Sequence, residues 1–219
     1  MPVGEDSGIV TIRTRDPRSR QRSIALDGVE TRTTSRDALK SSGIAEGDVH
    51  SEASIERELA EPEVEMAMRR AIRLLEYRER SVAELQRRLV DDGYPRRVAA
   101  AVTGRMAESG LVDDARFTES YVRTKRSASW GRRRIERGLA DSGVDPQIAT
   151  EVLERELPHH GEVTRALETI GESDTTDRRN RDKVLRKLIS RGFSYPDALE
   201  ALSERAARAS TENRNDFES

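Results

Sequence analysis

The chain has 219 residues, of which 37% are charged and 34% are hydrophobic. Only eight residues are aromatic, and no apolar run approaches the 18 or so residues of a membrane span, so the composition excludes a transmembrane protein and predicts no membrane partner. The absence of cysteine excludes disulfides and thiol chemistry, and the start MPVGEDSG lacks the basic and apolar regions of a secretory leader. We therefore expect a cytoplasmic protein.

Residues 1–60 are predicted to form an N-terminal extension that contains a β-hairpin at about 20–34. The pattern alternates on both sides of Asp27-Gly28, and this dipeptide suits a type I′ turn because both central positions of such a turn need positive φ. A lone hairpin is marginally stable in water, so we expect it to pack on the segment that follows.

The extension is expected to continue with short helices and an acidic linker. Ser35 is a suitable N-cap for a helix that ends near Gly43, and a second helix is predicted to begin near Ser51. Residues 48–65 carry seven acidic side chains against one arginine, which predicts an acidic linker ahead of the first strongly apolar helix.

From residue 61 onward the sequence repeats with a period of about 50 residues. The period is carried by two apolar positions and a helix-ending glycine: Leu85, Ile135 and Leu185; Val102, Val152 and Leu202; Gly93, Gly143 and Gly192. Each period contains three helical segments, which predicts three-helix repeats at 61–111, 112–158 and 159–209, followed by a disordered polar tail at 210–219. The predicted fold is mostly α: tandem three-helix repeats forming an elongated, curved rod, with a small N-terminal β-hairpin and helix extension.

Local signals mark the helix boundaries most clearly in the first repeat, whose first helix is expected at about 63–78. Ser81 and Glu84 form a capping box at the start of the second helix. Gly93 supplies the left-handed residue that ends this helix, and Pro95 begins the third.

No catalytic or metal-binding constellation is found in the sequence. There is no phosphate-binding glycine loop, no His-Glu-x-x-His helix and no Gly-x-Ser-x-Gly turn. His159 and His160 are adjacent and lack a third ligand nearby, so a turn is the better interpretation than a metal site. We expect no enzyme activity, no metal and no cofactor.

Two basic blocks stand out in the predicted second and third repeats. Residues 121–139 hold seven Arg or Lys against one Glu, and residues 178–191 hold seven against one Asp. We predict that a partner, either a polyanion or an acidic protein surface, is bound by residues from these blocks. These candidates are Arg123, Lys125, Arg126, Trp130, Arg132, Arg133, Arg134, Arg137, Arg179, Lys183, Arg186 and Lys187.

The helical wheel supports this hypothesis but leaves an alternative open. Because Ile135 and Leu139 are expected to face the core, Arg133 and Arg137 are predicted to point outward, with Arg132 and Arg134 on the flanks. The alternative is that these side chains only keep the helices soluble. For the single tryptophan, a partner anchor and a cover for its own repeat core are both open.

The same residues resemble the RecX family of bacterial regulators of the recombinase RecA, over nearly the whole chain. The resemblance is carried by Arg80-Ser81, Glu84-Leu85, Leu89 and Gly93; by Asp113-Asp114, Phe117, Tyr121-Val122, Gly131, Ile135, Leu139 and Gly143; and by Arg191-Gly192-Phe193-Ser194-Tyr195. It implies a non-enzymatic monomer that docks on the RecA nucleoprotein filament. There it would modulate, most often inhibit, ATP hydrolysis and strand exchange in homologous recombination, DNA repair and the SOS response, with DNA as a further partner.

A rival hypothesis is a direct DNA- or RNA-binding repeat protein, because three-helix units with basic second helices resemble tandem helix-turn-helix folds. One departure from the family pattern also makes a stability prediction. Gly138 lies inside a predicted helix, where glycine costs about 0.5–1 kcal/mol relative to alanine, so Gly138→Ala is expected to raise the melting temperature.

Overall fold

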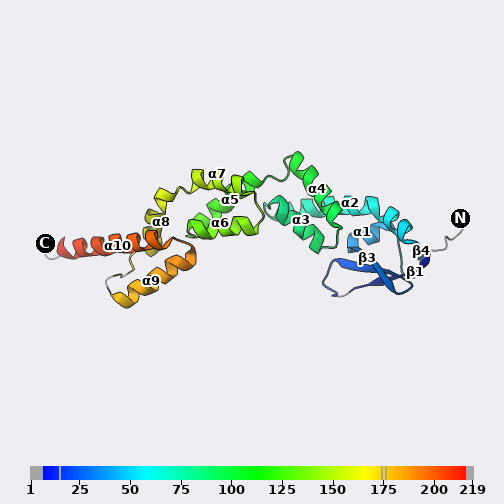
Figure 1. Cartoon of the computed structure of the whole chain (residues 1–219), viewed down its shortest axis with the longest axis horizontal. Helices are drawn as coiled ribbons and strands as arrows, with labels where there is room; N and C mark the ends of the chain where they lie inside the picture. Colours follow the sequence, from blue (N-terminus) through cyan, green and yellow to red (C-terminus); the bar gives the residue numbers. More distant parts are fainter. Residues whose placement is uncertain (1–6, 15, 174, 176, 216–219) are drawn as a thin grey trace. The chain divides into compact units, whose positions relative to one another are not determined.

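A computed structural model describes residues 7–14, 16–173, 175 and 177–215, with side chains up to residue 209. The chain divides into two units, one ending at Asp113 and the other beginning at Asp114. Helices dominate both units, and a small sheet lies in the first (Figure 1). Among the described residues, no helix is long and apolar enough to cross a membrane.

The sheet of the first unit contains the predicted hairpin and two further strands. Its antiparallel strands are β1 (Gly8–Arg13), β2 (Gln21–Leu26), β3 (Val29–Ser35) and the short β4 (Val49–His50), in the order β3-β2-β1-β4. Asp27 and Gly28 between β2 and β3 have φ of 50° and 85°, which confirms the type I′ turn. The two added strands complete a sheet whose inner face, with Val10, Ile24 and Leu26, packs on helices.

The helices of the first unit are α1 (Arg36–Ser42), α2 (Glu52–Tyr77), α3 (Val82–Asp91) and α4 (Arg96–Glu108). The predicted N-caps Ser35 and Ser81 are confirmed, as is the helix start predicted near Ser51. Each of the three serine side-chain oxygens accepts a hydrogen bond from an amide in the first turn of its helix. Gly93 follows α3 with φ of 100°, as expected for a residue that ends a helix.

The predicted acidic linker at 48–65 is wrong, because α2 begins at Glu52 and continues through Pro62. An internal proline removes a helical hydrogen bond and costs about 3 kcal/mol, so α2 continues through Pro62 against a local penalty. The helix persists because both halves are buried: Ile55 and Leu59 pack in the sheet core, whereas Ala67 and Ala71 pack in the core of the first repeat. The predicted boundary at 60/61 therefore falls inside one helix, and the extension and the first repeat share it.

The second unit contains six α-helices within the described residues. They are α5 (Asp114–Ser127), α6 (Arg132–Asp141), α7 (Pro146–Glu156), α8 (Glu162–Ile170), α9 (Arg178–Arg191) and α10 (Tyr195–Asn215). A short 3₁₀ turn, η1 (His159–Gly161), precedes α8 and confirms the turn assigned to the two histidines. One core gathers side chains of α5, α6 and α7, and another gathers those of α8, α9 and α10.

Two predictions about the second unit need correction. The predicted disordered tail is helical over 210–215, where α10 continues, while 216–219 lie outside the described residues. Gly138 makes room for a neighbour, because a Cβ atom there would overlap the Tyr121 hydroxyl and would lie 3.0 Å from its Cζ. Gly138 lies inside α6, as predicted, but this overlap opposes the gain in helix propensity, so the expected effect of Gly138→Ala is revised to a loss of stability.

Candidate partner-binding surface

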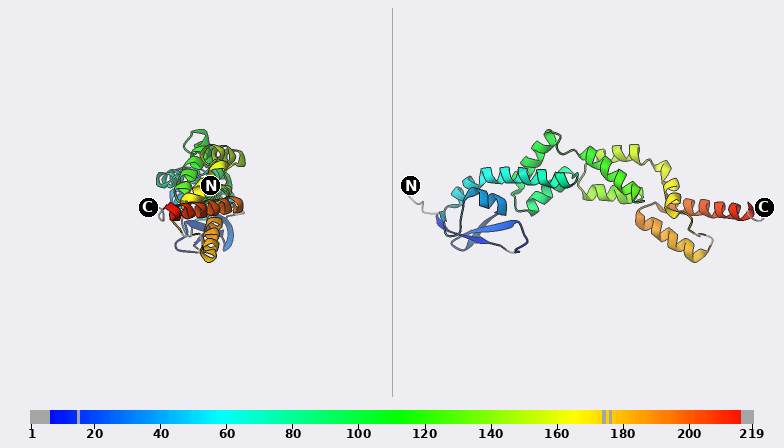
Figure 2. Two further views of the ribbon diagram at one scale, coloured as in Figure 1. Left: turned by 90° about the vertical axis from the view of Figure 1, so that its left-hand side faces the viewer. Right: turned by 180° about the vertical axis from the view of Figure 1, so that it is seen from behind.

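The end of α9 meets the beginning of α6, so the two basic blocks lie on adjoining helices (Figures 1 and 2). The amide of Gly131, the N-cap residue of α6, donates to the carbonyl of Arg191 at 2.8 Å. The amide of Arg133 donates to the carbonyl of Gly192 at 3.2 Å. Amides left free at one helix start thus satisfy carbonyls left free at another helix end.

Close backbone contact at this junction requires glycine on both sides. A Cβ on Gly131 would overlap the backbone of Gly192 and Phe193. A Cβ on Gly192 would lie 2.6 Å from the amide nitrogen of Arg134, and Gly192 also has φ of 95°. The two glycines therefore hold α6 and α9 in a contact that no larger residue permits.

Glu162, the first residue of α8, completes the cap of α6. Its carboxylate Oε2 accepts from the amide of Arg132 at 3.0 Å, and its Oε1 pairs with Arg165. Burial raises the pKa of the Glu162 carboxyl, against the opposing effects of the Arg132 amide and the Arg165 charge. Burial likewise lowers the pKa of Arg165, whose guanidinium also donates to the carbonyl of Trp130. A carboxylate at a helix N-terminus is favoured by the helix dipole, so this contact fixes α8 to α6.

Nine of the predicted site residues are exposed and make no ion pair within the described part of the chain, and six of these lie on α6 or α9 away from Trp130. The six are Arg133 and Arg137 on α6 and Arg179, Lys183, Arg186 and Lys187 on α9, and together they are called the basic surface. On each helix the positions recur at steps of three, four or seven residues, which places them on one face. Six unpaired cations on two adjoining helices produce a positive potential that attracts anionic partners.

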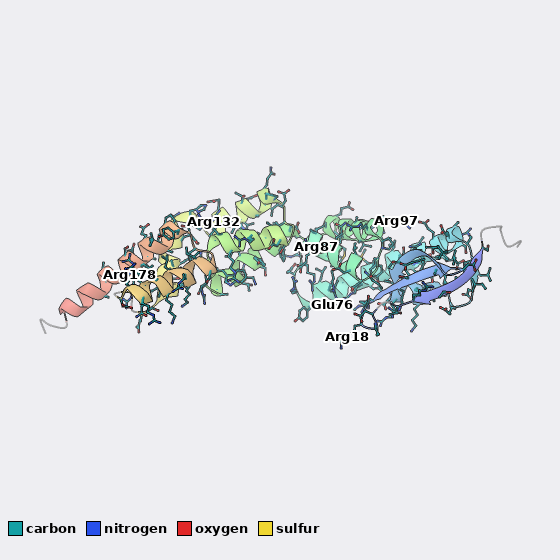
Figure 3. The ribbon with its side chains drawn as sticks, turned by 60° about the horizontal axis from the view of Figure 1, so that its bottom comes forward. Arg18, Glu76, Arg87, Arg97, Arg132 and Arg178 are labelled. Atoms are coloured by element: carbon teal, nitrogen blue, oxygen red, sulfur yellow. The ribbon has the colours of Figure 1, made fainter. Side chains whose placement is uncertain are left out.

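Arg132 does not belong to this surface, and its predicted outward position is wrong (Figure 3). The side chain is 5% exposed and donates to the carbonyls of Leu153 and Leu157 at 3.3 and 2.6 Å. It also pairs with Glu136 and Glu154 at 2.8 and 2.7 Å. Because a helix C-terminus leaves carbonyls without partners, the long arginine side chain folds inward to cap α7.

Trp130, Lys125 and the exposed Arg134 form a cluster beside the junction, called the Trp130 cluster. Trp130 is half-buried against the core of α5–α7, with Lys125 Nζ at 4.6 Å and Arg134 Cζ at 3.8 Å from its ring centroid. Arg134 also donates to the carbonyl of Ser190 at 3.3 Å, which adds another contact between α6 and α9. These cation–π contacts favour the interpretation that Trp130 covers the core of its own repeat, and not the interpretation that it anchors a partner.

The two remaining candidates lie on α5. Arg126 is exposed and donates to the carbonyl of Glu156 at 3.1 Å, which places it beside the end of α7. Arg123 is exposed, and no ion pair is found for it among the described residues. The structure thus separates the twelve candidates into the basic surface, the Trp130 cluster, the buried Arg132 and these two flanking residues.

Sequence reasoning missed the residues that hold the basic surface in place, above all Glu162, Arg165 and Arg191. The Arg191 side chain donates to the carbonyls of Ala128 and Ser129 at 3.1 and 3.4 Å. One signal was present: Gly131 stands 50 residues after Ser81, where a capping side chain is expected. No group of His, Cys, Asp and Glu in the described residues is arranged to hold a metal ion.

Comparison with known proteins identifies the three-helix units of this chain. Residues 67–106 match the first three-helix domain of RecX, and residues 113–153 match its second three-helix domain. The chain is 37% identical over 134 residues to the regulatory protein RecX of Chromohalobacter salexigens, covering 61% of this chain and 88% of the relative. This chain belongs to the RecX family. It is also 34% identical to RecX of Mycolicibacterium vanbaalenii over 65% of this chain and 84% of that relative.

Solved RecX structures share the fold. A crystal structure of regulatory protein RecX matches with a TM-score of 0.53 at 21% identity and covers 87% of this chain and 96% of its own. RecX from Lactobacillus salivarius matches with a TM-score of 0.54 at 23% identity and covers 66% of this chain and 97% of its own. The chain is therefore a RecX-family regulatory protein of three-helix repeats with an N-terminal strand region.

Proposed function

We propose that this protein is a non-enzymatic regulator that binds the RecA–DNA filament in the cytoplasm and inhibits ATP hydrolysis and strand exchange by RecA. The observation that carries the proposal is the basic surface, in a chain that belongs to the RecX family. Its six cations are free of internal ion pairs in the described residues, so a partner can bind them without first breaking contacts within the protein.

The junction between α6 and α9 supports this role because it positions the cations. The Gly131–Gly192 contact and Glu162 fix two cationic helices relative to each other, which reduces the entropy lost when a partner binds both. A filament presents the same partner surface many times, so several weak contacts give useful affinity through multivalent binding.

The deciding experiment is the steady-state ATPase rate of RecA on single-stranded DNA during titration with substoichiometric amounts of the protein. Inhibition is expected at protein concentrations that leave bare DNA unbound. An unchanged rate under conditions where RecA is saturated with DNA would contradict the proposal.

Direct binding of DNA or RNA is the second candidate, and the same unpaired cations favour it. A protein that neutralises several phosphates releases counterions, so its affinity falls by orders of magnitude between about 50 and 200 mM salt with no other protein present. A filament regulator instead requires RecA and binds bare DNA weakly. Affinity for a fluorescent oligonucleotide across this salt range separates the two candidates.

The contribution of the basic surface is tested by replacing Arg133, Arg137, Lys183 and Arg186 together with alanine. The helical circular dichroism should be retained, while inhibition of RecA should require at least about tenfold more protein. A matched control replaces four exposed cations of the first unit, Arg18, Lys40, Arg57 and Arg105, and removes the same total charge. Equal loss of activity in both variants would mean that net charge, not the basic surface, carries the effect.

A further inference from the structure

Strand β3 is an edge strand of unusual length and openness for this small sheet. It has seven residues and pairs only with β2, whereas the other edge strand, β4, has two residues. Among the described residues, the backbone of Thr31, Arg32 and Thr33 makes no hydrogen bond to an element other than β2. An unprotected edge of this kind presents donors and acceptors that match another extended chain.

A groove of about 520 Å³ runs along this edge. Thr31, Arg32 and Thr33 all line it, and because successive strand residues point to opposite faces, the groove follows the edge and not a face of the sheet. Its other walls come from the start of α2 and from the connection between α3 and α4: Glu52, Ile55 and Glu56; Val90, Gly93, Tyr94, Pro95, Arg96 and Arg97.

A second hollow extends the groove toward the hairpin turn. It shares Thr31, Glu52 and Glu56 with the first and reaches Val29, and because Gly8 of β1 also lines it, it continues across the end of the sheet beside the hairpin turn. The two hollows together are called the β3 groove, and the residues of β3 that line them lie between Val29 and Thr33. Five residues at about 3.3 Å each make roughly 16 Å of strand, which matches a short extended peptide.

We propose that the β3 groove binds an extended segment of a partner protein, which pairs with β3 as an added strand and carries a basic residue opposite Glu52. The free backbone groups of β3 can form hydrogen bonds with an extended segment of any sequence. The side chains of the groove walls then determine which sequences bind best. This proposal is independent of the RecA-directed function, because the groove lies entirely in the first unit and the basic surface lies in the second.

The walls indicate the chemistry of the occupant. Glu56 is paired with Arg97 at 2.8 Å, whereas Glu52 and Arg96 are both exposed and make no ion pair within the described residues. Val29 is 69% exposed at one end, and buried Ile55 and Tyr94 form an apolar floor at the other. A segment with apolar side chains at alternate positions, a lysine or arginine near Glu52 and an acidic residue near Arg96 complements these features.

One end of the groove is closed, which fixes the register of the added strand. At Gly93 the connection after α3 approaches β3 so closely that a Cβ atom would lie 2.6 Å from the Thr34 carbonyl oxygen. Arg97, labelled in Figure 3, lies on the neighbouring first turn of α4. The added strand therefore ends beside Thr33, and its length is limited by the structure and not by the partner.

The test selects a random heptapeptide library, displayed on phage, on the full-length protein. Enriched sequences are expected to alternate apolar residues with others and to contain lysine or arginine. A synthetic peptide of the enriched sequence should protect the amides of residues 29–33 from hydrogen exchange. No enriched sequence, or protection confined to other segments, would overturn the proposal.

Two further experiments, one that changes the peptide and one that changes the protein, distinguish strand pairing from nonspecific binding. N-methylation of the peptide at alternate amides should abolish binding, and at the intervening amides should have little effect, because only every second amide of an added strand faces β3. Glu52→Lys should weaken binding by about tenfold, whereas Glu61→Lys, the same change at an exposed α2 residue outside the groove, should alter it by less than about twofold. Equal effects of the two substitutions, or of the two methylation patterns, would refute the assigned site.

Discussion

The second helices of the first two repeats, α3 and α6, begin in different ways. In α3 the Ser81 hydroxyl accepts from the Glu84 amide at 3.0 Å, so the cap joins two residues that are three positions apart. In α6 the equivalent position, 50 residues on, is Gly131, which has no side chain to offer. Its cap comes from α8 and α9, through Glu162 and the carbonyls of Arg191 and Gly192.

A helix capped by a nearby side chain and a helix capped by another part of the fold differ in what their stability depends on. The start of α3 is stabilised whether or not another repeat is present. The start of α6 is completed only when the following helices are folded and docked, so its stability and its position depend on them. The basic surface spans this dependent junction, which links partner binding to the folding of the last three helices.

Gly192→Ala is expected to have the largest effect on the tertiary cap. Overlap with Arg134 costs about 3 kcal/mol and the left-handed backbone of alanine about 1 kcal/mol more. Urea denaturation followed by the fluorescence of Trp130 reports this loss, since the single tryptophan lies beside the junction. Gly43→Ala is the matched control, followed by circular dichroism because it lies in the first unit: its φ of 82° is similar, but no atom of the described residues lies within 4 Å of the added Cβ, so only about 1 kcal/mol should be lost. Similar losses in the two variants would argue against the close contact.

Glu162→Ala is expected to destabilise the second unit by about 3 kcal/mol, because it leaves the Arg132 amide and the Arg165 guanidinium without their buried partner. The same denaturation experiment measures it. Glu168→Ala removes an exposed glutamate from the same helix and should cost less than about 0.5 kcal/mol. A small loss for Glu162→Ala would mean that α6 keeps its cap without α8.

Gly138→Ala tests a second contrast between the repeats. Positions 71 and 88 in the first repeat are Ala and Arg, whereas the equivalents in the second are Tyr121 and Gly138. The overlap with the Tyr121 hydroxyl should lower stability by about 2 kcal/mol, measured as the shift of the denaturation midpoint. Tyr121→Phe in the same chain should restore part of this loss, and a higher melting temperature for Gly138→Ala alone would show that helix propensity prevails.

Ser81→Ala removes the local cap of α3 and should cost about 1 kcal/mol. Because the cap is local, this loss should leave the Trp130 fluorescence transition unchanged while hydrogen exchange in α3 accelerates. A change in the tryptophan transition would indicate that the two caps are energetically coupled.

The smallest effect is expected from Glu162→Gln, which keeps a hydrogen-bond acceptor but does not titrate. Burial raises the pKa of the Glu162 carboxyl above its ordinary value of 4.5, so the folded state holds its proton more tightly than the unfolded chain. The wild-type carboxyl therefore contributes most stability below pH 4.5 and loses this contribution as the pH rises through the raised pKa. Denaturation midpoints of the two proteins, compared from pH 4 to 8, should diverge in favour of Gln; a difference independent of pH would exclude this effect.

Much of the secondary structure was predictable because its signals are local. The type I′ turn at Asp27-Gly28, the serine caps and the positive φ of Gly93 and Gly192 each depend on a few neighbouring residues. The wrong prediction of an acidic linker at the start of α2 arose because contacts distant in the sequence decide the structure there. Pro62 opposes a helix locally, and burial of Ile55 and Leu59 against the sheet outweighs it.

The candidate site was predictable only in part. The exposed cations of α9 followed from periodicity, since none of them has a buried partner in the part of the chain that the structure describes. Arg132 did not, because its wheel position says nothing about the carbonyls that α7 leaves free 21 to 25 residues away. The role of Trp130 as a cover of the repeat core likewise depends on its contacts with Arg134 and with that core.

By itself the sequence determined the repeat period, the starts and ends of most helices, and the residues that carry the charge, because these depend on backbone conformations and spacings within a few residues. Only the tertiary structure decided which arginines face solvent, why glycine stands at positions 131, 138 and 192, and how α6 is capped. The physical reason is the distance along the chain between the groups involved. A cap from Glu162 or a contact with Gly192 joins residues 30 to 60 apart, and no local pattern contains them both.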